Sequence, residues 1–347
     1  MQTSRITGHG RRVGLGLALV LIGSMPLRSQ DFQPEIQPLP KQLPTYEEMK
    51  IPADNPLTPE KVALGRQLFF DKRLSVDGTR SCYSCHLCEN GLTDGKPKAI
   101  GVGDKPLKRS SPTLWNIGYH KEFYWDGRSP SLEAQGAAAW RGGNMGAQGK
   151  ENEIVAKINA VPGYKKQFQS IFKSDATVDN IFKAITSFER TIISGDTAYD
   201  RFKAGDKKAM TKQQQAGWKL FQDLKCNNCH DGVLFTDQQY HNVGVGMDGE
   251  KADDAGRFDK TKKVEDTGAF KTPTLRDITK SAPYFHDGSI KTLEEALDFM
   301  LGGGKDNKYL DKKNLEKRKT TPAQRKNLLA FLKALEVDCK LTAPKLP

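Results

Sequence analysis

Two short motifs in the chain place a pair of cysteines directly before a histidine. Their members are Cys82, Cys85 and His86 in the first motif, and Cys226, Cys229 and His230 in the second. Two thiols three positions apart can add to the two vinyl groups of one haem, and the adjacent histidine can then bind the iron. The chain has only 6 cysteines and 6 histidines in 347 residues, so chance does not explain two copies. The sequence therefore predicts two covalently attached haem c groups.

Other roles for paired cysteines need a different sequence context. A redox dithiol is expected within a strand–helix–strand pattern, and a zinc site needs further Cys or His pairs at finger spacing. The sequence contains neither. Cys88 and Cys339 lie outside both motifs. A mutual disulfide, two buried thiols and pairing between molecules are all compatible with the sequence.

A series of short motifs occurs twice along the chain. Gly-x-x-Leu-Phe precedes the first Cys pair from Gly65 and the second from Gly217. Further on, Pro-Thr-Leu-x-x-Ile at 112–117 returns at 273–278, and an Asp-Gly pair followed by Leu-Glu returns at the same offset of 161 residues. Internal repeats of this kind predict two homologous haem domains.

Helix signals dominate the sequence between the motifs. Four threonines begin expected helices, because each is followed by a proline or by Gln or Glu at capping-box spacing: Thr58, Thr211, Thr292 and Thr321. A further helix is expected after Thr177, where an apolar stripe runs at helical spacing from Ile181 through Ile192 and stops before Gly195. Without convincing alternating strands, the expected fold class is all-α.

The N-terminus has the pattern of an export signal. Three arginines precede an apolar run from Val13 to Met25, which is too short to span a bilayer and predicts a signal peptide cut between Ser24 and Gln30. An uncleaved tether is the alternative. The expected division is a signal peptide (1–30), an extended proline-rich arm (31–56), a first haem domain (57–200), a second haem domain (205–335) and a C-terminal tail (336–347). We expect a periplasmic protein.

The net charge of +12 permits binding to acidic partners. Export argues against nucleic acid, so an acidic protein partner is the better expectation. Much of the excess positive charge lies between residues 305 and 326. This stretch could be a docking surface or simply a solvated loop and helix face.

Taken in order, four segments resemble the bacterial di-haem cytochrome c peroxidase and MauG-type family over about residues 57–335. They are the first Cys pair, Phe-Tyr-Trp-Asp-Gly-Arg at 123–128, the second Cys pair, and the segment 270–289. The resemblance implies two cytochrome c-like domains that face each other. It further implies hydrogen peroxide as substrate, reduced to water at the first haem with electrons from a small cytochrome c or cupredoxin that enter at the second. Homodimers are common in the family.

The resemblance implies that the second haem has a closed iron site. The family's distal methionine stands 14 residues after the histidine of Tyr-Phe-His-Asp-Gly, which places it at Met300 after His286. A thioether opposite His230 would raise the reduction potential. Met300 could instead be a core residue, and His241 is the other candidate ligand. MauG itself has a tyrosine at this position.

The first haem is expected to be open. Ala139 stands at the duplicated position of Met300, and the loop in which many family members carry a ligand histidine reads Ile-Gly-Val-Gly at 100–103. His86 alone should therefore hold the iron and leave one face for peroxide. His120 is a candidate substitute ligand, although we expect it to be exposed and not a ligand.

Three residues of the first half resemble functional positions of the family. Gln135 matches a pocket glutamine, and Asn144 stands where the family has a catalytic glutamate. An amide can orient peroxide but cannot transfer a proton at neutral pH. Arg141 could assist by its charge or be a surface cation. Trp125 matches an aromatic between the haems that could relay electrons, or it could be a core tryptophan.

The family also carries a calcium ion between its domains, bound near Ser281 and Pro283. Its usual asparagine ligand aligns with Ser110, which puts calcium in doubt. Two other functions remain open beside the peroxidase. One is a MauG-like oxidation of a partner protein, and the other is a non-catalytic electron carrier.

Overall fold

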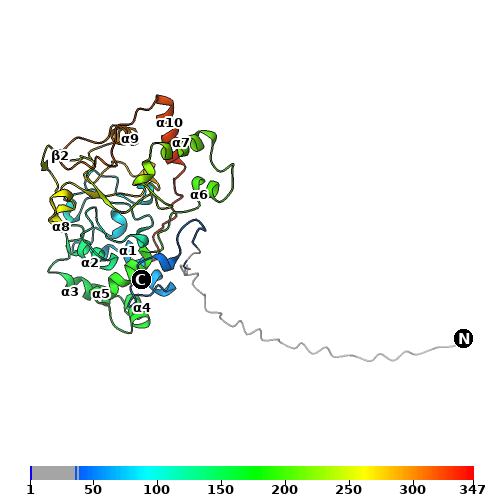
Figure 1. Cartoon of the computed structure of the whole chain (residues 1–347). Coiled ribbons are helices and arrows are strands. Elements are labelled where there is room, and N and C mark those ends of the chain that lie inside the picture. Colours follow the sequence, from blue (N-terminus) through cyan, green and yellow to red (C-terminus); the bar gives the residue numbers. More distant parts are fainter. Residues whose placement is uncertain (2–35, 37–38) are drawn as a thin grey trace. The chain divides into compact units, whose positions relative to one another are not determined.

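The computed structural model describes Met1, Ile36 and residues 39–347, so the predicted signal peptide beyond Met1 lies outside the described residues. The described residues from Ile36 onwards form one compact unit. This unit is rich in helices and contains little sheet (Figure 1). Within the described part of the chain, no helix is long and apolar enough to cross a membrane.

The described residues form ten α-helices, which are joined by turns and loops. They are α1 (Pro59–Phe70), α2 (Leu132–Arg141), α3 (Glu151–Asn159), α4 (Pro162–Phe172), α5 (Val178–Glu189), α6 (Ala198–Lys203), α7 (Lys212–Asp223), α8 (Phe258–Thr261), α9 (Leu293–Leu301) and α10 (Pro322–Lys333). Single 3-10 turns are η1 (Tyr46–Glu48), η2 (Lys72–Leu74), η3 (Cys82–Ser84), η4 (Cys88–Asn90), η5 (Val102–Asp104), η6 (Ile117–Tyr119), η7 (Cys226–Asn228), η8 (Val264–Asp266) and η9 (Ile278–Lys280). Helices α1–α5 lie in the lower part of Figure 1, and α6, α7, α9 and α10 lie in its upper part.

The predicted helix starts are confirmed. Thr58, Thr211, Thr292 and Thr321 each accept a hydrogen bond from the backbone N–H three residues later, and the last three form capping boxes. Thr177 caps α5 in the same way. The apolar stripe predicted after Thr177 extends beyond this helix. Helix α5 ends at Glu189, and Ile192 is buried in the turn that follows.

One pair of crossing helices organises each half of the unit. Helix α1 packs on α5, and α7 packs on α10. Gly65 and Gly217 allow these close approaches, since a Cβ at either position would lie 1.9 Å from a carbonyl oxygen of the facing helix, that of Ala184 or Asn327. Each pair is the centre of its own hydrophobic core.

The segments after these pairs correspond in backbone detail. Asn116 and Asp277, which are 161 residues apart, both adopt the left-handed conformation at φ 60° and 59°. The N–H of Asn116 donates to the carbonyl of Ile192, and that of Asp277 donates to the carbonyl of Leu335, both at 3.0 Å. Each bond joins the loop of the repeated motif to the turn that follows α5 or α10.

The little sheet in the described residues lies where the second half is longer than the first. β1 (Tyr240–His241) pairs with β4 (Phe270–Lys271), and β2 (Met247–Asp248) pairs with β3 (Lys251–Ala252). The sequence did not predict these strands, because two residues are too few to show an alternating pattern.

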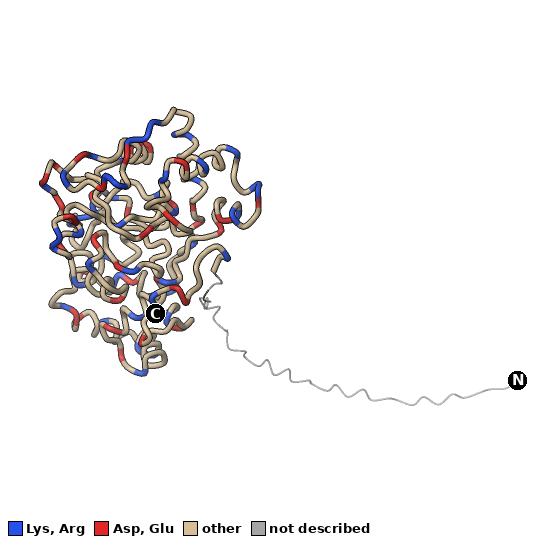
Figure 2. The backbone as a smooth tube through the Cα atoms, viewed as in Figure 1, with Lys and Arg blue, Asp and Glu red and all other residues tan. Residues whose placement is uncertain are grey.

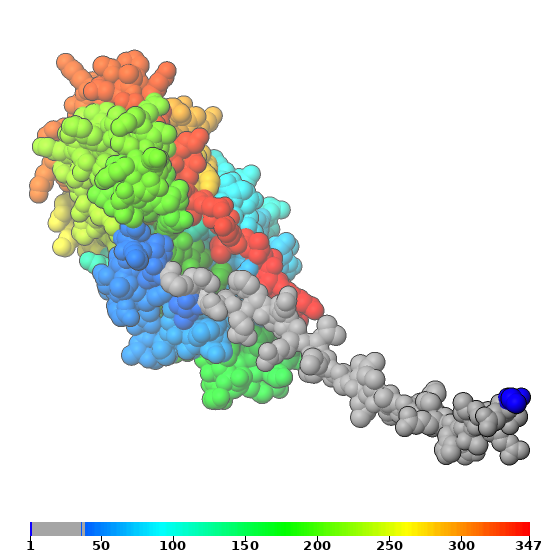
Figure 3. Space-filling model, turned by 90° about the vertical axis from the view of Figure 1, so that its right-hand side faces the viewer, coloured from blue at the N-terminus to red at the C-terminus, as the bar shows by residue number. Residues whose placement is uncertain are grey.

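The C-terminal tail leaves α10 and returns to the first half. Figure 3 shows this segment in red, running across the surface. Cys339 in the tail forms a disulfide with Cys88, so the mutual disulfide is the correct one of the three alternatives. Arg66 of α1 donates to the carbonyl of Thr342, 2.8 Å away. The tail therefore connects the end of the second half to the loop beside His86.

Charged side chains of both signs are interspersed along the chain (Figure 2). The basic stretch 305–326 is partly neutralised by neighbours. Its members make three ion pairs with acids, namely Lys308–Glu250, Lys312–Asp306 and Arg325–Asp298. The exposed pairs contribute little to stability, but they reduce the positive field of this surface.

Candidate functional site

The first Cys pair lies on a tight turn that brings its members together. Cys82 begins η3, and the N–H of Cys85 donates to the carbonyl of Cys82 at 3.1 Å. The two thiols are not joined to each other. Nδ1 of His86 lies 2.9 Å from the carbonyl oxygen of Leu92. Burial lowers the pKa of His86 to about 4, so the ring is neutral, donates through Nδ1 and keeps Nε2 as the nitrogen that can bind a metal.

The second Cys pair repeats this arrangement. Cys226 begins η7, Cys229 is its C-cap, and both thiols are free. Nδ1 of His230 lies 3.2 Å from the carbonyl oxygen of Phe235. Burial also lowers the pKa of His230, which again favours the neutral ring.

The repeated Pro-Thr-Leu motif holds both histidine loops in place. The hydroxyl of Thr113 donates to the carbonyl of Gly91 at 2.8 Å, and the hydroxyl of Thr274 donates to that of Leu234 at 2.7 Å. These carbonyls belong to the loops that follow His86 and His230. The motif therefore supports the two loops that follow the candidate iron ligands.

Arg276 adds a support that occurs only in the second half. Its Nε donates to the carbonyl of Val233 at 2.7 Å, and its other two nitrogens pair with Asp200 at 2.8 Å. Both side chains are at most 2% exposed, so removing either would leave a buried charge without its partner. The sequence reasoning missed this pair, although Arg276 lies inside the repeated motif.

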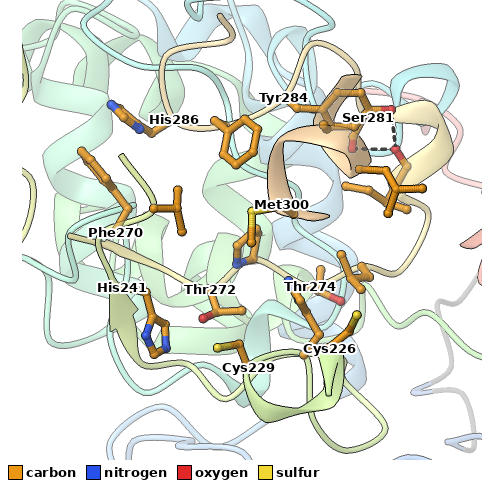
Figure 4. A pocket seen from close by; sticks show the side chains of 18 of the residues that line it. Cys226, Cys229, His241, Phe270, Thr272, Thr274, Ser281, Tyr284, His286 and Met300 are labelled. Atoms are coloured by element: carbon orange, nitrogen blue, oxygen red, sulfur yellow. Dashed lines mark hydrogen bonds between the residues drawn. The ribbon is translucent and has the colours of Figure 1, made fainter. Parts of the chain in front are cut away.

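A largely apolar cavity opens above the second Cys pair. Its lining includes Cys226, Cys229, His230, Met300 and Trp125. Figure 4 shows Met300 extending into the cavity, with Cys226 and Cys229 on one side and Tyr284 and His286 on the other. Two unpaired thiols, a neutral imidazole and a thioether around an apolar space fit a haem c with His and Met ligands.

His241 also lines this cavity, but both of its ring nitrogens have other partners. Nδ1 lies 2.6 Å from Asp311 Oδ2, and Nε2 lies 3.0 Å from Asp237 Oδ2. These contacts favour Met300 over His241 as the distal ligand. Cys229, Asp237 and His241 could together hold a metal ion, but attachment to haem would convert the Cys229 thiol into a thioether.

Comparisons with known proteins identify the family. The family profile described as di-haem cytochrome c peroxidase matches residues 59–208. The methylamine utilization protein MauG of Methylorubrum extorquens is 36% identical over 304 residues, which cover 85% of this chain and 84% of that protein. The cytochrome-c peroxidase IdrP1 of Denitromonas iodatirespirans is 34% identical, covering 98% of this chain and 97% of the relative. The chain belongs to the di-haem cytochrome c peroxidase and MauG family.

A solved structure agrees with this membership. The crystal structure of a MauG-like protein associated with microbial copper homeostasis matches with a TM-score of 0.81 and 33% identity. The match covers 88% of this chain and 97% of that one. Family membership implies haem c cofactors, and the two Cys pairs are the residues of this chain that fit them.

The first half of this family member lacks a counterpart of Met300. Ala139 occupies the matching place on α2 and offers no ligand atom. The loop 100–103 packs on the turn after α2, where the N–H of Val102 donates to the carbonyl of Gly143 at 3.1 Å. The loop in which the family resemblance would place a ligand histidine therefore lies beside Asn144 and carries Val102.

The candidate pocket residues of the first half lie at the two ends of α2. Gln135 is partly buried in the first turns, and its carbonyl accepts from the hydroxyl of Tyr124 at 3.2 Å. Asn144 is partly buried in the turn that follows the helix. Arg141 is exposed and pairs with Glu151 at 3.2 Å, which supports its interpretation as a surface cation.

Trp125 reaches from the first half to the cavity of the second. Its indole N–H donates to the carbonyl of Ser110 at 3.0 Å, and its own carbonyl accepts from the N–H of Lys271 at 2.8 Å. The Ser110 hydroxyl donates to the carbonyl of Phe285 at 2.8 Å. This tryptophan is therefore fixed at the junction of the halves rather than within one core.

The expected exposure of His120 is wrong. His120 is 7% exposed, and its Nδ1 lies 3.1 Å from the ammonium nitrogen of Lys271. Burial and the Lys271 charge lower the pKa of His120, so the neutral ring accepts a hydrogen bond from the ammonium group. The sequence offered no signal of this contact, because 151 residues separate the partners.

Proposed function

We propose that this family member is a di-haem cytochrome c peroxidase that reduces hydrogen peroxide to water at the first haem. Electrons arrive singly from a small cytochrome c or cupredoxin and enter at the second haem. The observation that carries this proposal is the difference between matching positions. Met300 lines the cavity of the second half, whereas the first half has Ala139.

Bound haem would supply one-electron redox chemistry and, where a coordination position is open, a place for peroxide to bind. The chain would attach one haem through Cys82 and Cys85 and the other through Cys226 and Cys229. His86 and His230 would provide neutral proximal nitrogens, each fixed by the hydrogen bond of its Nδ1.

Trp125 is proposed as the relay between the two haems. It touches the cavity of the second half while belonging to the first, and its indole N–H is held by Ser110. A fixed aromatic ring in this place would divide the electron transfer between the two haems into two shorter steps. Its packing role and its relay role are compatible.

Gln135 and Asn144 are proposed to orient peroxide in the first pocket. Each amide can donate or accept a hydrogen bond, but neither can carry a proton at neutral pH. Cleavage of the O–O bond needs a proton at the departing oxygen, so water must supply it or turnover must be slow.

The cellular setting of the proposal follows from the sequence. We propose that the mature protein acts in the periplasm, that its halves 57–200 and 205–335 arose by duplication, and that it can form a homodimer. A calcium ion at the junction stays a prediction, which isothermal titration with calcium would test. The sedimentation coefficient of the protein would test the predicted homodimer.

A MauG-like oxidation of a partner protein is the second candidate. It is supported by the similarity to the MauG-named relatives and by the absence of a carboxylate at Asn144. The third candidate, an electron carrier, would need a sixth ligand at both irons.

Steady-state peroxide consumption with a reduced small cytochrome c separates these functions. The peroxidase proposal predicts that each peroxide oxidises two donor molecules and that catalytic turnover continues until peroxide is exhausted. No consumption above that of free donor would refute it. Accumulation of a long-lived oxidised state without donor turnover would favour the MauG-like function.

A further inference from the structure

Glu189 is a buried acid that the proposed function does not use. It is the last residue of α5 and is 6% exposed. Its Oε2 atom is fully enclosed, and among the described residues it has no hydrogen-bond partner. A buried carboxyl oxygen without a partner is costly, so it calls for an explanation in terms of a missing group or a function.

The cation that attracts Glu189, the adjacent Arg190, also pairs with another acid. Arg190, the next residue, places Nη1 2.7 Å from Glu133 Oε1 and Nη2 3.2 Å from Glu133 Oε2. Glu133 projects from α2, and its oxygens also accept hydrogen bonds from Asn55 and Thr186. Arg190 therefore attracts the Glu189 carboxylate only partly, and Glu133 repels it.

The helix α1 that packs on α5 brings no counter-charge to Glu189. It presents Gly65 to α5, and the ammonium group of Lys61 donates to Asn55 and to the carbonyl of Pro56. Burial raises the pKa of Glu189 to about 8, because its effect exceeds the attraction of Arg190, and Glu133 adds a smaller repulsion. At neutral pH this carboxyl is therefore mainly protonated.

Glu189 lies close enough to Cys82 to act on it. Burial raises the pKa of the Cys82 thiol, and the charge of Glu189 raises it further. Cys82 lies in η3, which packs on α1. In the holoprotein this thiol would be a thioether without charge, which leaves Arg190 and Glu133 as the charged neighbours of Glu189.

The second half carries a leucine at the matching place. Ala184 faces Gly65 as Asn327 faces Gly217. Ile192 and Leu335, which accept the matching backbone hydrogen bonds, are separated by the same number of residues as Ala184 and Asn327. The same separation matches Glu189 with Leu332. Leu332 lines the cavity that holds Met300. The first half thus has an ionisable group where the wall of the second cavity is apolar.

We propose that Glu189 is a redox-linked proton site of the first haem, a role that rests on the proposed attachment of haem at Cys82. Above about pH 8, where the Glu189 carboxyl is ionised, the carboxylate takes up one proton from solvent when an electron from the donor enters this haem, and the proton leaves when the electron leaves. A negative charge added nearby in a low-dielectric interior raises the proton affinity of a carboxylate. By linkage, deprotonation of Glu189 must lower the reduction potential of the haem by the same free energy.

Spectroelectrochemical titration of the full-length holoprotein between about pH 6 and 10 tests this proposal. The midpoint of the first haem should be constant below about pH 8 and fall above it, with a slope that approaches ~59 mV per pH unit, the value for one proton per electron. Glu189→Gln keeps the shape but cannot ionise, so its slope should be near zero. Glu189→Leu, which copies the second half, should behave in the same way.

The second haem in each sample serves as the internal control, because its midpoint should be unaffected by either substitution. The reciprocal change Leu332→Glu should give the second haem a pH-dependent midpoint. An unchanged slope for the first haem in Glu189→Gln would overturn the proposal.

Redox-induced infrared difference spectra of the wild-type protein provide a second test if the variants do not fold. Above about pH 8, reduction of the first haem should produce the carbonyl stretch of a protonated carboxyl group, and its absence would contradict the proposal. Haem staining of the denatured protein distinguishes the two failures. Without haem at Cys82 the proposed function fails as well, whereas two haems with a flat first midpoint refute only the role of Glu189.

Discussion

Met300 and Ala139 show how one side chain can separate two otherwise similar haem positions. Both stand on a helix that follows the repeated Asp-Gly turn, and Met300 lines a cavity together with His230. A thioether can saturate an iron and favour electron transfer, while a methyl group leaves a position for substrate. In the proposed function, this pair of residues accounts for the different roles of the two haems.

Replacement of Met300 by leucine should abolish the near-infrared sulfur-to-iron charge-transfer band of the oxidised protein. Leucine keeps nearly the same volume and removes only the sulfur, so the fold should be retained. Near-infrared absorption or magnetic circular dichroism measures the band. Met210→Leu is the matched control, since Met210 is buried in the core of the same half. A band that persists in Met300→Leu would transfer the ligand role to another residue.

Asn144→Glu should accelerate peroxide consumption by at least about tenfold, because a positioned proton carrier contributes ~10²–10⁴-fold in rate. Gln135→Ala should slow the reaction by removing an orienting amide. Stopped-flow mixing with peroxide measures both rates. Asn144→Gln is the control, as it lengthens the side chain without adding an acid. A slow rate that glutamate leaves unchanged would remove Asn144 from the pocket.

For individual residues, the sequence was informative where the residues that act together lie close to one another along the chain. The residues proposed to bind each haem lie within five positions of each other, so their spacing alone predicts them. The burial of His120 and Glu189 could not be predicted, because each depends on partners from distant segments. Glu189 follows Phe188 of the apolar stripe directly, which is the one signal that could have drawn attention to it.

Among the structural elements, the C-terminal tail connects the second half of the chain to the first. Val337 donates its N–H to Asp277 Oδ1 at 2.9 Å, and Trp115 of the first half donates to Asp277 Oδ2 at 3.1 Å. The disulfide follows two residues later in the tail, and it holds η4 just beyond His86. The tail therefore fastens the loop that follows His86 to the second half.

Cys88→Ser should lower the free energy of unfolding by about 2–5 kcal/mol, the usual cost of losing a native disulfide. Denaturant unfolding monitored by far-UV circular dichroism measures it. Cys339→Ser and the double variant should lose the same amount, since each removes the same bond. A double variant that loses twice as much as either single one would show that the cysteines stabilise the fold independently.

The helix starts were predictable from capping residues, whereas the tail was not. Thr177 and Thr292 carry their partners within three residues, so the signal is contained in the sequence. Cys88 and Cys339 are 251 residues apart, and their pairing depends on how the tail crosses the surface. Short strands such as β1 also depend on a partner segment rather than on their own two residues.

In the whole molecule, buried polar groups join the two halves. The ammonium group of Lys271 donates to His120 Nδ1 at 3.1 Å and to the carbonyl of Glu122 at 2.7 Å. Arg109 bridges Asp126 of the first half and Asp254 of the second, at 2.7 Å each. The relative position of the halves, and with it the place of Trp125, depends on these contacts.

Acidification below pH ~6.5 should destabilise the protein through His120. The folded state lowers the pKa of this histidine below the ordinary value of ~6.5, so the unfolded chain binds the proton first. The contribution to stability is complete above that pH and is lost as pH falls toward the folded pKa. The slope from this one group is at most about 1.4 kcal/mol per pH unit.

His120→Gln should reduce this slope, because the glutamine oxygen can accept from Lys271 without titrating. Denaturant unfolding at a series of pH values measures the slope. His286, whose pKa burial lowers to about 4, titrates in the same direction and should preserve part of it in the variant. An identical slope in both proteins would show that His120 does not control the acid sensitivity.

The electron paramagnetic resonance spectrum of the fully oxidised protein, before and after one equivalent of peroxide, tests the central claim most directly. With Ala139 and Val102 supplying no ligand, the first haem should give a high-spin signal, and Met300 should make the second low-spin. The high-spin signal alone should disappear at once on addition of peroxide, without prior reduction. A spectrum with only low-spin signals, or a high-spin signal that does not respond to peroxide, would contradict the peroxidase and favour an electron carrier.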